Sequence, residues 1–293
     1  MRIGITDSGV GGLSVCAAVE ERLRGETHAQ DVEIFYLNAA LRDDYSYNAM
    51  PSRQQKLETF DRFLANVAAR YRPDMLYIAC NSLSVLFQDP YFDHHRHIPI
   101  MGILETGTAA ILSALAADDD AAVIVFATPT TVEEGTYRKN LIDAGIAPER
   151  IVQQACPGLP DAISNDFSGR QARVLLERFV PEALARFTTP PPRVKAFLGC
   201  THYGYQAKQF DSLLRKSVHS VDVLNPNNDA ATAILEGISK PAGDGSLNVH
   251  FVTPYEIPEK PLASLPHYLG GMAPSTIAAL RQFVHDPGLY EGS

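Results

Sequence analysis

Two cysteines that follow apolar runs are the residues of this chain best suited to chemistry. Cys80 follows MLYIA and Cys200 follows KAFLG, and each run has the length and composition of a buried strand. Two thiols on opposite sides of one carbon can remove a proton from one face and deliver a proton to the other. This pair therefore predicts chemistry that inverts the configuration of a carbon centre.

The residues after each cysteine, NSLSVLFQ and THYGYQAKQF, are typical of a helix start. Unpaired N–H groups in a first helical turn favour negative charge and lower a thiol's pKa from about 8.5. We therefore expect accessible thiolates at Cys80 and Cys200. Two alternatives stay open, namely buried structural cysteines, and a nucleophilic Cys200 activated by His202, which would leave Cys80 without a role.

Short polar side chains lie beside both cysteines and at the end of the first apolar run. Asp7 and Ser8 belong to ITDSGVGG, whose glycines allow backbone N–H groups to approach a carboxylate, although the pattern is not GxGxxG. Asp7 is predicted to assist proton transfer near Cys80 or to hold a ligand's ammonium group. A purely structural tight turn is the alternative.

The polar neighbours of the thiols suit the charged ends of an amino acid. Asn81 and Ser82 follow one cysteine, and Thr201 and His202 follow the other. Helix capping is the alternative role for Ser82 and Thr201. His202 is predicted to polarise the substrate or to keep Cys200 ionised.

The remaining cysteines and histidines do not predict a metal or a cofactor. The four cysteines are far apart and show no CxxC spacing, and Cys16 fits the buried face of a helix. His94, His95 and His97 stand in a polar segment, where solvated histidines are typical, and nothing else in the sequence completes a ligand set. We expect neither metal nor cofactor.

Short apolar runs alternate with helical patterns along most of the chain, which predicts an α/β fold with mainly parallel, doubly wound sheets. The expected strands are Arg2–Thr6, Val32–Leu37, Met75–Ala79, Ile98–Leu104, Val123–Phe126, Ile151–Ala155, Val194–Leu198 and Val221–Leu224. A further strand is expected at NVHFVT and a final helix at PSTIAALRQFV. The range Pro254–Gly271, rich in proline, is expected to be a long connection.

The expected strand ends repeat with a spacing of 120 residues, since Asp7, Asn38, Cys80 and Leu104 correspond to Ala127, Gly158, Cys200 and Leu224. We interpret this as a duplicated unit of four strands, the alternative being βα units of similar length. Functional sites of open α/β sheets form at the carboxyl ends of the strands. If the two halves face each other, the two thiols face each other as well.

Composition excludes several classes of protein. The net charge of −9 and the absence of a basic run argue against nucleic-acid binding. No apolar run reaches the length of a membrane span and no signal peptide is evident, so we expect a cytoplasmic protein without a membrane partner.

Five segments together resemble the glutamate racemases of the aspartate/glutamate racemase superfamily, and the likeness extends over most of the chain. They are ITDSGVGGLSV, IACNSLS, ILETG, ATPTTVEEGTY and LGCTHY. The resemblance implies conversion of L-glutamate to D-glutamate for peptidoglycan precursors, without pyridoxal phosphate or metal. It also implies a homodimer and two lobes related by a pseudo-twofold axis, with the active site in the cleft between them. We place the lobes at 1–98 plus 210–293 and at 99–209.

The resemblance also implies roles for individual residues. Cys80 and Cys200 would be the acid/base pair, with Asp7 and His202 assisting. The substrate-binding groups would be Ser8, Asn81, Ser82, Thr201 and Tyr45.

Departures from the family pattern fall in the substrate segment. The family's D-x-x-R-x-P-Y-G is replaced by NAALRDDYSY, with Asp44-Tyr45-Ser46 in place of Pro-Tyr-Gly. The acidic residue that the family carries after a CP dipeptide has no clear counterpart in GLPDAISND, where Asp161 is the candidate substitute. Gly204 replaces the proline of CTHYP. Aspartate or another acidic amino acid is therefore an alternative substrate. A catalytically silent amino-acid-binding regulator and a related isomerase or decarboxylase are further alternatives.

Overall fold

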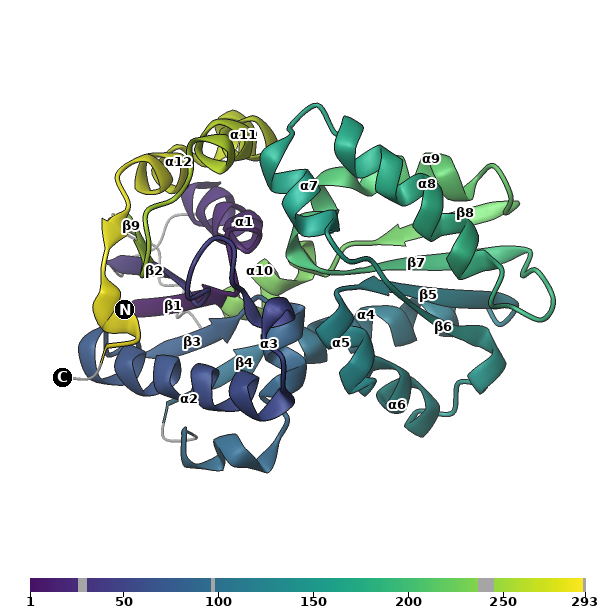
Figure 1. The fold of residues 1–293 in the computed structure, drawn as a ribbon, viewed down its shortest axis with the longest axis horizontal. Coiled ribbons are helices and arrows are strands. Elements are labelled where there is room, and N and C mark those ends of the chain that lie inside the picture. The colour runs from purple at the N-terminus through teal and green to yellow at the C-terminus, as the bar shows by residue number, and fades with distance from the viewer. Residues whose placement is uncertain (26–30, 96–97, 237–244, 292–293) are drawn as a thin grey trace.

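The chain folds into two α/β lobes that lie side by side (Figure 1). The structure, a computed structural model, describes residues 1–25, 31–95, 98–236 and 245–291. In this part of the chain the first lobe has a six-stranded sheet of order β10-β9-β2-β1-β3-β4, and the second has a four-stranded sheet of order β6-β5-β7-β8. All of these pairings are parallel. The α/β class with parallel sheets is therefore confirmed.

The elements have the following bounds. The strands are β1 Arg2–Asp7, β2 Val32–Asn38, β3 Met75–Ile78, β4 Ile100–Gly102, β5 Ala121–Ala127, β6 Ile151–Ala155, β7 Arg193–Gly199, β8 Ser220–Leu224, β9 Leu247–Thr253 and β10 Val284–His285. The α-helices are α1 Leu13–Gly25, α2 Arg53–Arg70, α3 Asn81–Leu86, α4 Ile103–Ala116, α5 Pro129–Glu134, α6 Thr136–Asp143, α7 Leu159–Asn165, α8 Arg170–Leu184, α9 Ala207–Leu214, α10 Pro226–Glu236, α11 Glu259–Leu269 and α12 Pro274–Arg281. The 3₁₀ helices are η1 Tyr47–Ala49, η2 Pro90–His95, η3 Pro148–Arg150, η4 Thr201–Gln206, η5 Gly270–Met272 and η6 Pro287–Leu289.

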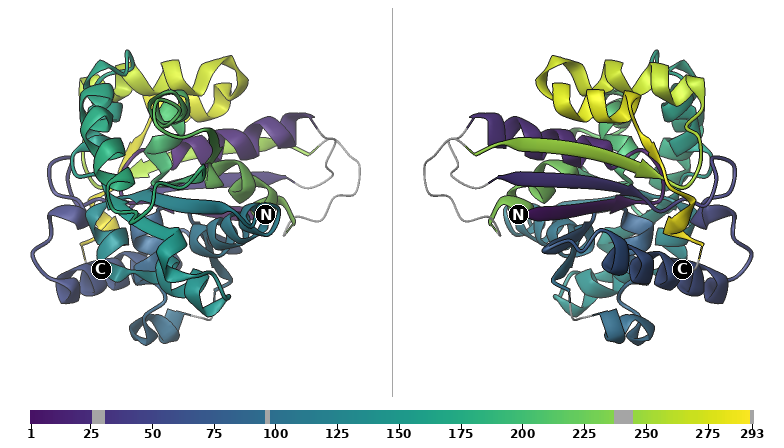
Figure 2. Two further views of the ribbon diagram at one scale, coloured as in Figure 1. Left: turned by 90° about the vertical axis from the view of Figure 1, so that its right-hand side faces the viewer. Right: turned by 90° about the vertical axis from the view of Figure 1, so that its left-hand side faces the viewer.

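Each sheet is covered by helices on both faces. In β3, Met75 and Tyr77 belong to the core against α1, α10 and α11, whereas Leu76 and Ile78 belong to the core against α2 and α3. Side views show the first sheet between the C-terminal helices on one face and α2 on the other (Figure 2). Burial on both faces explains why the strands are continuous apolar runs instead of alternating ones.

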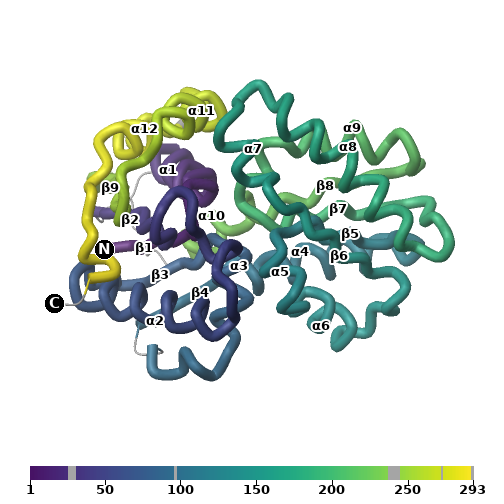
Figure 3. Tube along the Cα trace, viewed as in Figure 1, coloured from purple at the N-terminus to yellow at the C-terminus, as the bar shows by residue number. Residues whose placement is uncertain are grey.

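The duplication predicted from the sequence is visible as a repeated strand order. The first four strands form β2-β1-β3-β4, and the next four form β6-β5-β7-β8. The chain therefore passes into the second lobe after β4 and returns after β8, as the trace shows (Figure 3).

Strand pairing moves both of the lobe boundaries expected from the sequence. Ile100 of β4 pairs with Leu76 of the first lobe, and Ser220 of β8 pairs with Arg193 of the second. Boundaries at 98/99 and 209/210 would separate each fourth strand from its own sheet. The four-strand repeat is the physical unit, because the fourth strand of each unit completes its hydrogen bonds only beside the third.

Two local expectations were wrong. The strand expected over Ile98–Leu104 is shorter, because Ile103 already begins α4. The range Pro254–Gly271 contains the helix α11, in which Pro261 lies in the first turn, where its missing N–H is not needed. Leu265 and Leu269 bury this helix in the core of the first lobe, which outweighs the local bias of the prolines.

In the part of the chain that the structure describes, no helix combines the length and apolar character needed to cross a lipid bilayer.

The final helix α12 is attached to the first lobe by a buried carboxylate. Glu20 of α1 has no exposed surface and accepts hydrogen bonds from the backbone N–H groups of Ser275 at 2.8 Å and Thr276 at 2.7 Å. These donors belong to the first turn of α12 and have no partner within their own helix. The positive end of the α12 helix dipole also stabilises the negative charge of this carboxylate.

Replacing this carboxylate should destabilise the first lobe. We expect Glu20→Ala to lower the free energy of unfolding by about 1–3 kcal/mol, because the buried N–H group of Thr276 and the partly buried N–H group of Ser275 lose a charged acceptor. Urea denaturation followed by circular dichroism measures the change. The neighbouring exposed Glu21 supplies the control, and Glu21→Ala should stay within about 0.5 kcal/mol. Equal stability of both variants would contradict this account of α12.

Candidate active site

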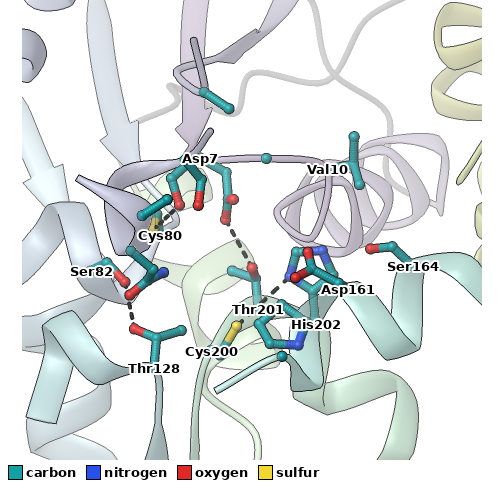
Figure 4. A pocket seen from close by; sticks show the side chains of 18 of the residues that line it. Asp7, Val10, Cys80, Ser82, Thr128, Asp161, Ser164, Cys200, Thr201 and His202 are labelled. Atoms are coloured by element: carbon teal, nitrogen blue, oxygen red, sulfur yellow. Dashed lines mark hydrogen bonds between the residues drawn. The ribbon is translucent and has the colours of Figure 1, made fainter. Parts of the chain in front are cut away.

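A cavity of about 450 Å³ lies between the two lobes and is lined by residues of both (Figure 4). The first lobe contributes the turn after β1 and the start of α3, and the second lobe contributes the start of α5, the turn after β6 and the start of η4. These are the carboxyl ends of parallel strands, where functional sites of open α/β sheets form. Eight of the residues predicted from the sequence line it, namely Asp7, Ser8, Cys80, Asn81, Ser82, Cys200, Thr201 and His202.

The two thiols occupy equivalent positions in the two lobes. Cys80 precedes α3 after β3, the third strand of the first four-strand unit, and Cys200 precedes η4 after β7, the third strand of the second unit. Their exposed fractions are only 6% and 7%. The fold thus brings together in one cavity two sulfurs that are 120 positions apart in the sequence.

Burial makes both thiols weaker acids than the sequence suggests. Desolvation, with a further contribution from the charge of Asp7, raises the pKa of Cys80 to about 11. The same two causes raise the pKa of Cys200 well above its ordinary value. The expectation of accessible thiolates is therefore wrong. Only a six-residue helix and a 3₁₀ turn follow the cysteines, and their N–H groups do not offset the loss of water.

Asp7 links the two sides of the cavity. Its carboxylate, 2% exposed, accepts a hydrogen bond of 2.8 Å from Oγ1 of Thr201 in the other lobe. Burial raises the pKa of Asp7 to about 6, although Thr201 and the N–H groups of Gly12 and Gly9 oppose the shift. The side chain therefore titrates near neutrality and can exchange a proton under ordinary conditions.

Steric crowding explains why the glycine-rich turn needs a glycine at Gly11. A Cβ atom at this position would lie 2.3 Å from Nδ1 of His202 and 2.4 Å from Oγ1 of Thr201. Only a residue without a side chain lets the first lobe's turn approach η4 so closely. The turn thus positions His202 and Thr201 beside Asp7.

His202 is a neutral ring beside Cys200. Its Nδ1 lies 3.7 Å from the Cys200 sulfur, and burial lowers the pKa of His202 to about 4. An uncharged imidazole does not stabilise a thiolate by charge, so the prediction that His202 keeps Cys200 ionised needs correction. It remains able to exchange hydrogen bonds with the sulfur or with a ligand.

Ser8 is within hydrogen-bonding distance of the other thiol, with 3.0 Å between its Oγ and the Cys80 sulfur. Ser82 belongs to a hydroxyl cluster, since its Oγ lies 2.7 Å from Oγ1 of Thr128 and 3.4 Å from Oγ1 of Thr131. Hydroxyl groups therefore lie beside Cys80 and at the adjacent start of α3.

The side-chain amide of Asn81 has an N–H donor for which the described chain supplies no acceptor. Its Oδ1 accepts a hydrogen bond of 2.6 Å from the hydroxyl of Tyr137, while its buried Nδ2 has no partner. A buried amide N–H without a partner is costly unless a ligand or water satisfies it. Tyr137 thus fixes the amide with its donor free, a role that no signal in the sequence identified, because the two residues are 56 positions apart.

Part of the segment NAALRDDYSY, which was expected to contact the substrate, lines the cavity, but Tyr45 does not. Its hydroxyl accepts a hydrogen bond of 3.2 Å from Gln55, and the guanidinium of Arg42 lies 5.3 Å from its ring centre. The neighbours Asp44 and Ser46 line the cavity instead. A local bridge between Arg42 and Tyr45 turns the tyrosine towards α2.

Acidic side chains at the cavity were only partly anticipated. Asp161 lines it, together with Asp43, which sequence reasoning did not single out. Desolvation raises the pKa of both carboxyls, and the charge of Asp43 adds to the shift at Asp161. No lysine or arginine is found among the described residues that line the cavity. A carboxylate ligand would therefore depend on neutral donors such as Asn81.

Comparison with known proteins gives a consistent picture. A family model described as Asp/Glu/Hydantoin racemase matches residues 3–234. The glutamate racemase of Aquifex pyrophilus is 28% identical over 255 residues, which cover 86% of this chain and 88% of that protein.

Solved structures share the fold. The crystal structure of the Aquifex pyrophilus glutamate racemase has a TM-score of 0.65 and 25% identity, with 92% of this chain and 95% of that chain covered. A glutamate racemase isoform from Bacillus anthracis has a TM-score of 0.70 and 21% identity, with coverage of 92% and 94%. The latter supports the two-lobed fold alone.

The protonation state of the thiols can be measured through their reactivity. Because only the thiolate is alkylated and the pKa of Cys80 is about 11, the rate of Cys80 modification by iodoacetamide should rise about tenfold per pH unit from pH 7 to 10. Mass spectrometry of proteolytic peptides measures this rate, with glutathione as the reference. A plateau near pH 8 would instead indicate the low-pKa thiolate expected from the sequence.

Proposed function

The chain belongs to the Asp/Glu/Hydantoin racemase family, and on this premise we propose that it is a cofactor-independent racemase that interconverts L-glutamate and D-glutamate by proton transfer between two cysteines. The observation that carries the proposal is the pair of thiols, Cys80 and Cys200, lining one cavity from opposite lobes. Glutamate is the first substrate to test, because the matching relative from Aquifex pyrophilus is a glutamate racemase covering most of the chain.

The proposed reaction needs one thiolate and one thiol. The thiolate takes the proton from the α-carbon, the electron pair of the C–H bond stays on the substrate, and the opposite thiol delivers its proton to the other face. The two cysteines thereby exchange protonation states. In the reverse direction their roles are interchanged.

The raised pKa values of the thiols fit this task. The α-hydrogen of an amino acid is a very weak acid, so a strong base is required, and a thiolate with a high pKa is a stronger base than an ordinary one. The cost is a small thiolate population at neutral pH. We propose that Asp7, with a pKa of about 6, accepts the proton that ionises Cys80, and that the substrate's ammonium group stabilises the resulting charge.

The charged ends of the substrate have candidate partners in the cavity. We assign the free Nδ2 of Asn81 to the α-carboxylate. Once Asp7 has taken up the proton of Cys80, its carbonyl oxygen accepts a hydrogen bond from the ammonium group. Ser8 and Thr201 are hydroxyl groups beside these two, and His202 is a neutral hydrogen-bonding partner for Cys200. Neutral donors would bind the carboxylate, because no lysine or arginine is found among the described residues that line the cavity.

A different amino acid is the second candidate substrate, and the acidic lining is the observation that favours it. Asp43 and Asp161 line the cavity and disfavour a second carboxylate nearby. The α-proton exchange of glutamate, aspartate and a wider panel in deuterated solvent, followed by NMR, separates the candidates. Tight binding in calorimetry without exchange would indicate a silent regulator.

By resemblance, D-glutamate would supply peptidoglycan precursors in the cytoplasm, and the enzyme would be a homodimer.

Loss of either thiol should abolish racemisation. We expect Cys80→Ser and Cys200→Ser each to reduce kcat by at least about a thousandfold. A serine hydroxyl is a far weaker acid than a thiol, so it neither ionises to act as the base nor readily delivers a proton. Circular dichroism of the glutamate solution measures the rate. Cys16→Ser is the control, since this thiol lies in the first lobe's core and does not line the cavity. Retained turnover in either variant would remove that cysteine from the mechanism.

Tyr137 should act as a positioning residue through Asn81. Without its hydroxyl the Asn81 amide loses the partner that orients it, so Tyr137→Phe should raise KM about tenfold with a smaller change in kcat. The matched control is Tyr77→Phe, which removes a 3.2 Å contact between the Tyr77 hydroxyl and Oγ1 of Thr106, away from the cavity lining. Equal KM values in both variants would show a merely structural role.

A further inference from the structure

Two neighbouring histidines and an aspartate bring their donor atoms together on the first lobe, outside the cavity. The Nε2 atoms of His94 and His95 each lie 2.7 Å from Oδ1 of Asp61. The three donor atoms all lie within 4.8 Å of one another. We propose that this cluster is a binding site for a divalent transition-metal ion, with zinc as the best-suited ion.

The elements around the cluster position it firmly. Asp61 lies in the middle of α2, an 18-residue helix, and the histidines end η2. Phe92 of η2 is buried and packs edge-on against Phe60 of α2, with ring centres 5.5 Å apart. This contact holds the end of η2 against α2, so the two histidines contact the carboxylate of Asp61, which follows Phe60.

The donor set matches the coordination chemistry of zinc. Zinc takes imidazole nitrogens at about 2.0–2.1 Å and carboxylate oxygens at about 2.0–2.2 Å, usually in a tetrahedron. Ligand atoms in such a tetrahedron are about 3.4 Å apart, so the two 2.7 Å separations need to widen by about 0.7 Å. We expect rotation of the side chains to provide this movement. Because the His94 side chain is 58% exposed, water can reach the fourth position.

The sequence could not reveal this site. The histidines were interpreted as solvated because no ligand near them completed a set, but Asp61 precedes His95 by 34 residues and approaches it only through the packing of η2 on α2. His97, the third histidine of this segment, lies outside the described residues. Of the three ligands none lines the cavity, so the ion would connect α2 to η2 and would take no part in proton transfer.

The alternative is a cluster held by hydrogen bonds alone, with Asp61 accepting from both rings. The two cases differ in a measurable way. Metal binding requires deprotonated imidazole nitrogens and therefore releases protons, and it stabilises the folded chain in proportion to the free metal concentration. A hydrogen-bonded cluster shows neither effect on addition of zinc.

The test is titration of the full chain with zinc sulfate in isothermal calorimetry. Because Cys80, Cys200 and His202 are themselves metal-binding side chains, the titration uses the Cys80→Ser/Cys200→Ser background. We expect one equivalent to bind with micromolar or stronger affinity, and zinc to raise the melting temperature. In that background, His94→Gln and Asp61→Asn should each weaken binding at least tenfold.

The controls distinguish a specific site from surface binding. His94→Gln changes an exposed side chain, so it tests the site without disturbing the core. The exposed His219 of the second lobe supplies the matched variant, His219→Gln, which should bind zinc unchanged. Absence of binding, or equal affinities in the His94 and His219 variants, would overturn the proposal. Neither result bears on racemisation, because the site is independent of the cavity.

Discussion

The hydrogen bond between Thr201 and Asp7 is the interaction around which the cavity is organised. It joins the end of the first strand of one lobe to the turn after the central strand of the other, over a distance of 2.8 Å. Gly11 makes this contact sterically accessible. Because the bond spans the lobes, it joins the two strand ends beside the shared cavity, which both cysteines line.

Exclusion of water then sets the acid–base character of the cavity. Desolvation raises the pKa of a carboxyl and of a thiol and lowers the pKa of an imidazole, since it disfavours the charged form in each case. The pKa of Asp7 rises to about 6, the pKa of His202 falls to about 4, so that its ring is uncharged at neutral pH, and the pKa of Cys80 rises to about 11. The same burial that makes the thiols poor nucleophiles at rest makes them strong bases once ionised. This property suits proton abstraction from carbon better than it suits nucleophilic attack.

The duplicated architecture explains why a two-sided site arises here. Each four-strand unit presents one cysteine after its third strand, and the strand order is the same in both units. Facing the two units towards each other brings equivalent strand ends to one cavity. Outside it, the cluster of Asp61, His94 and His95 shows that packing of sequence-distant elements also assembles donor atoms away from the duplicated site.

The sequence by itself determined the α/β class and the four-strand repeat, and it placed Cys80 and Cys200 at equivalent strand ends, because strand periodicity and strand-end chemistry are local properties. Tertiary structure alone decided the lobe boundaries, the helix over Glu259–Leu269, the exclusion of Tyr45 and the partnership of Tyr137 with Asn81. It also reversed the expected pKa shifts of the thiols. Burial and hydrogen bonding between distant segments cause these effects, and neither is encoded in neighbouring residues.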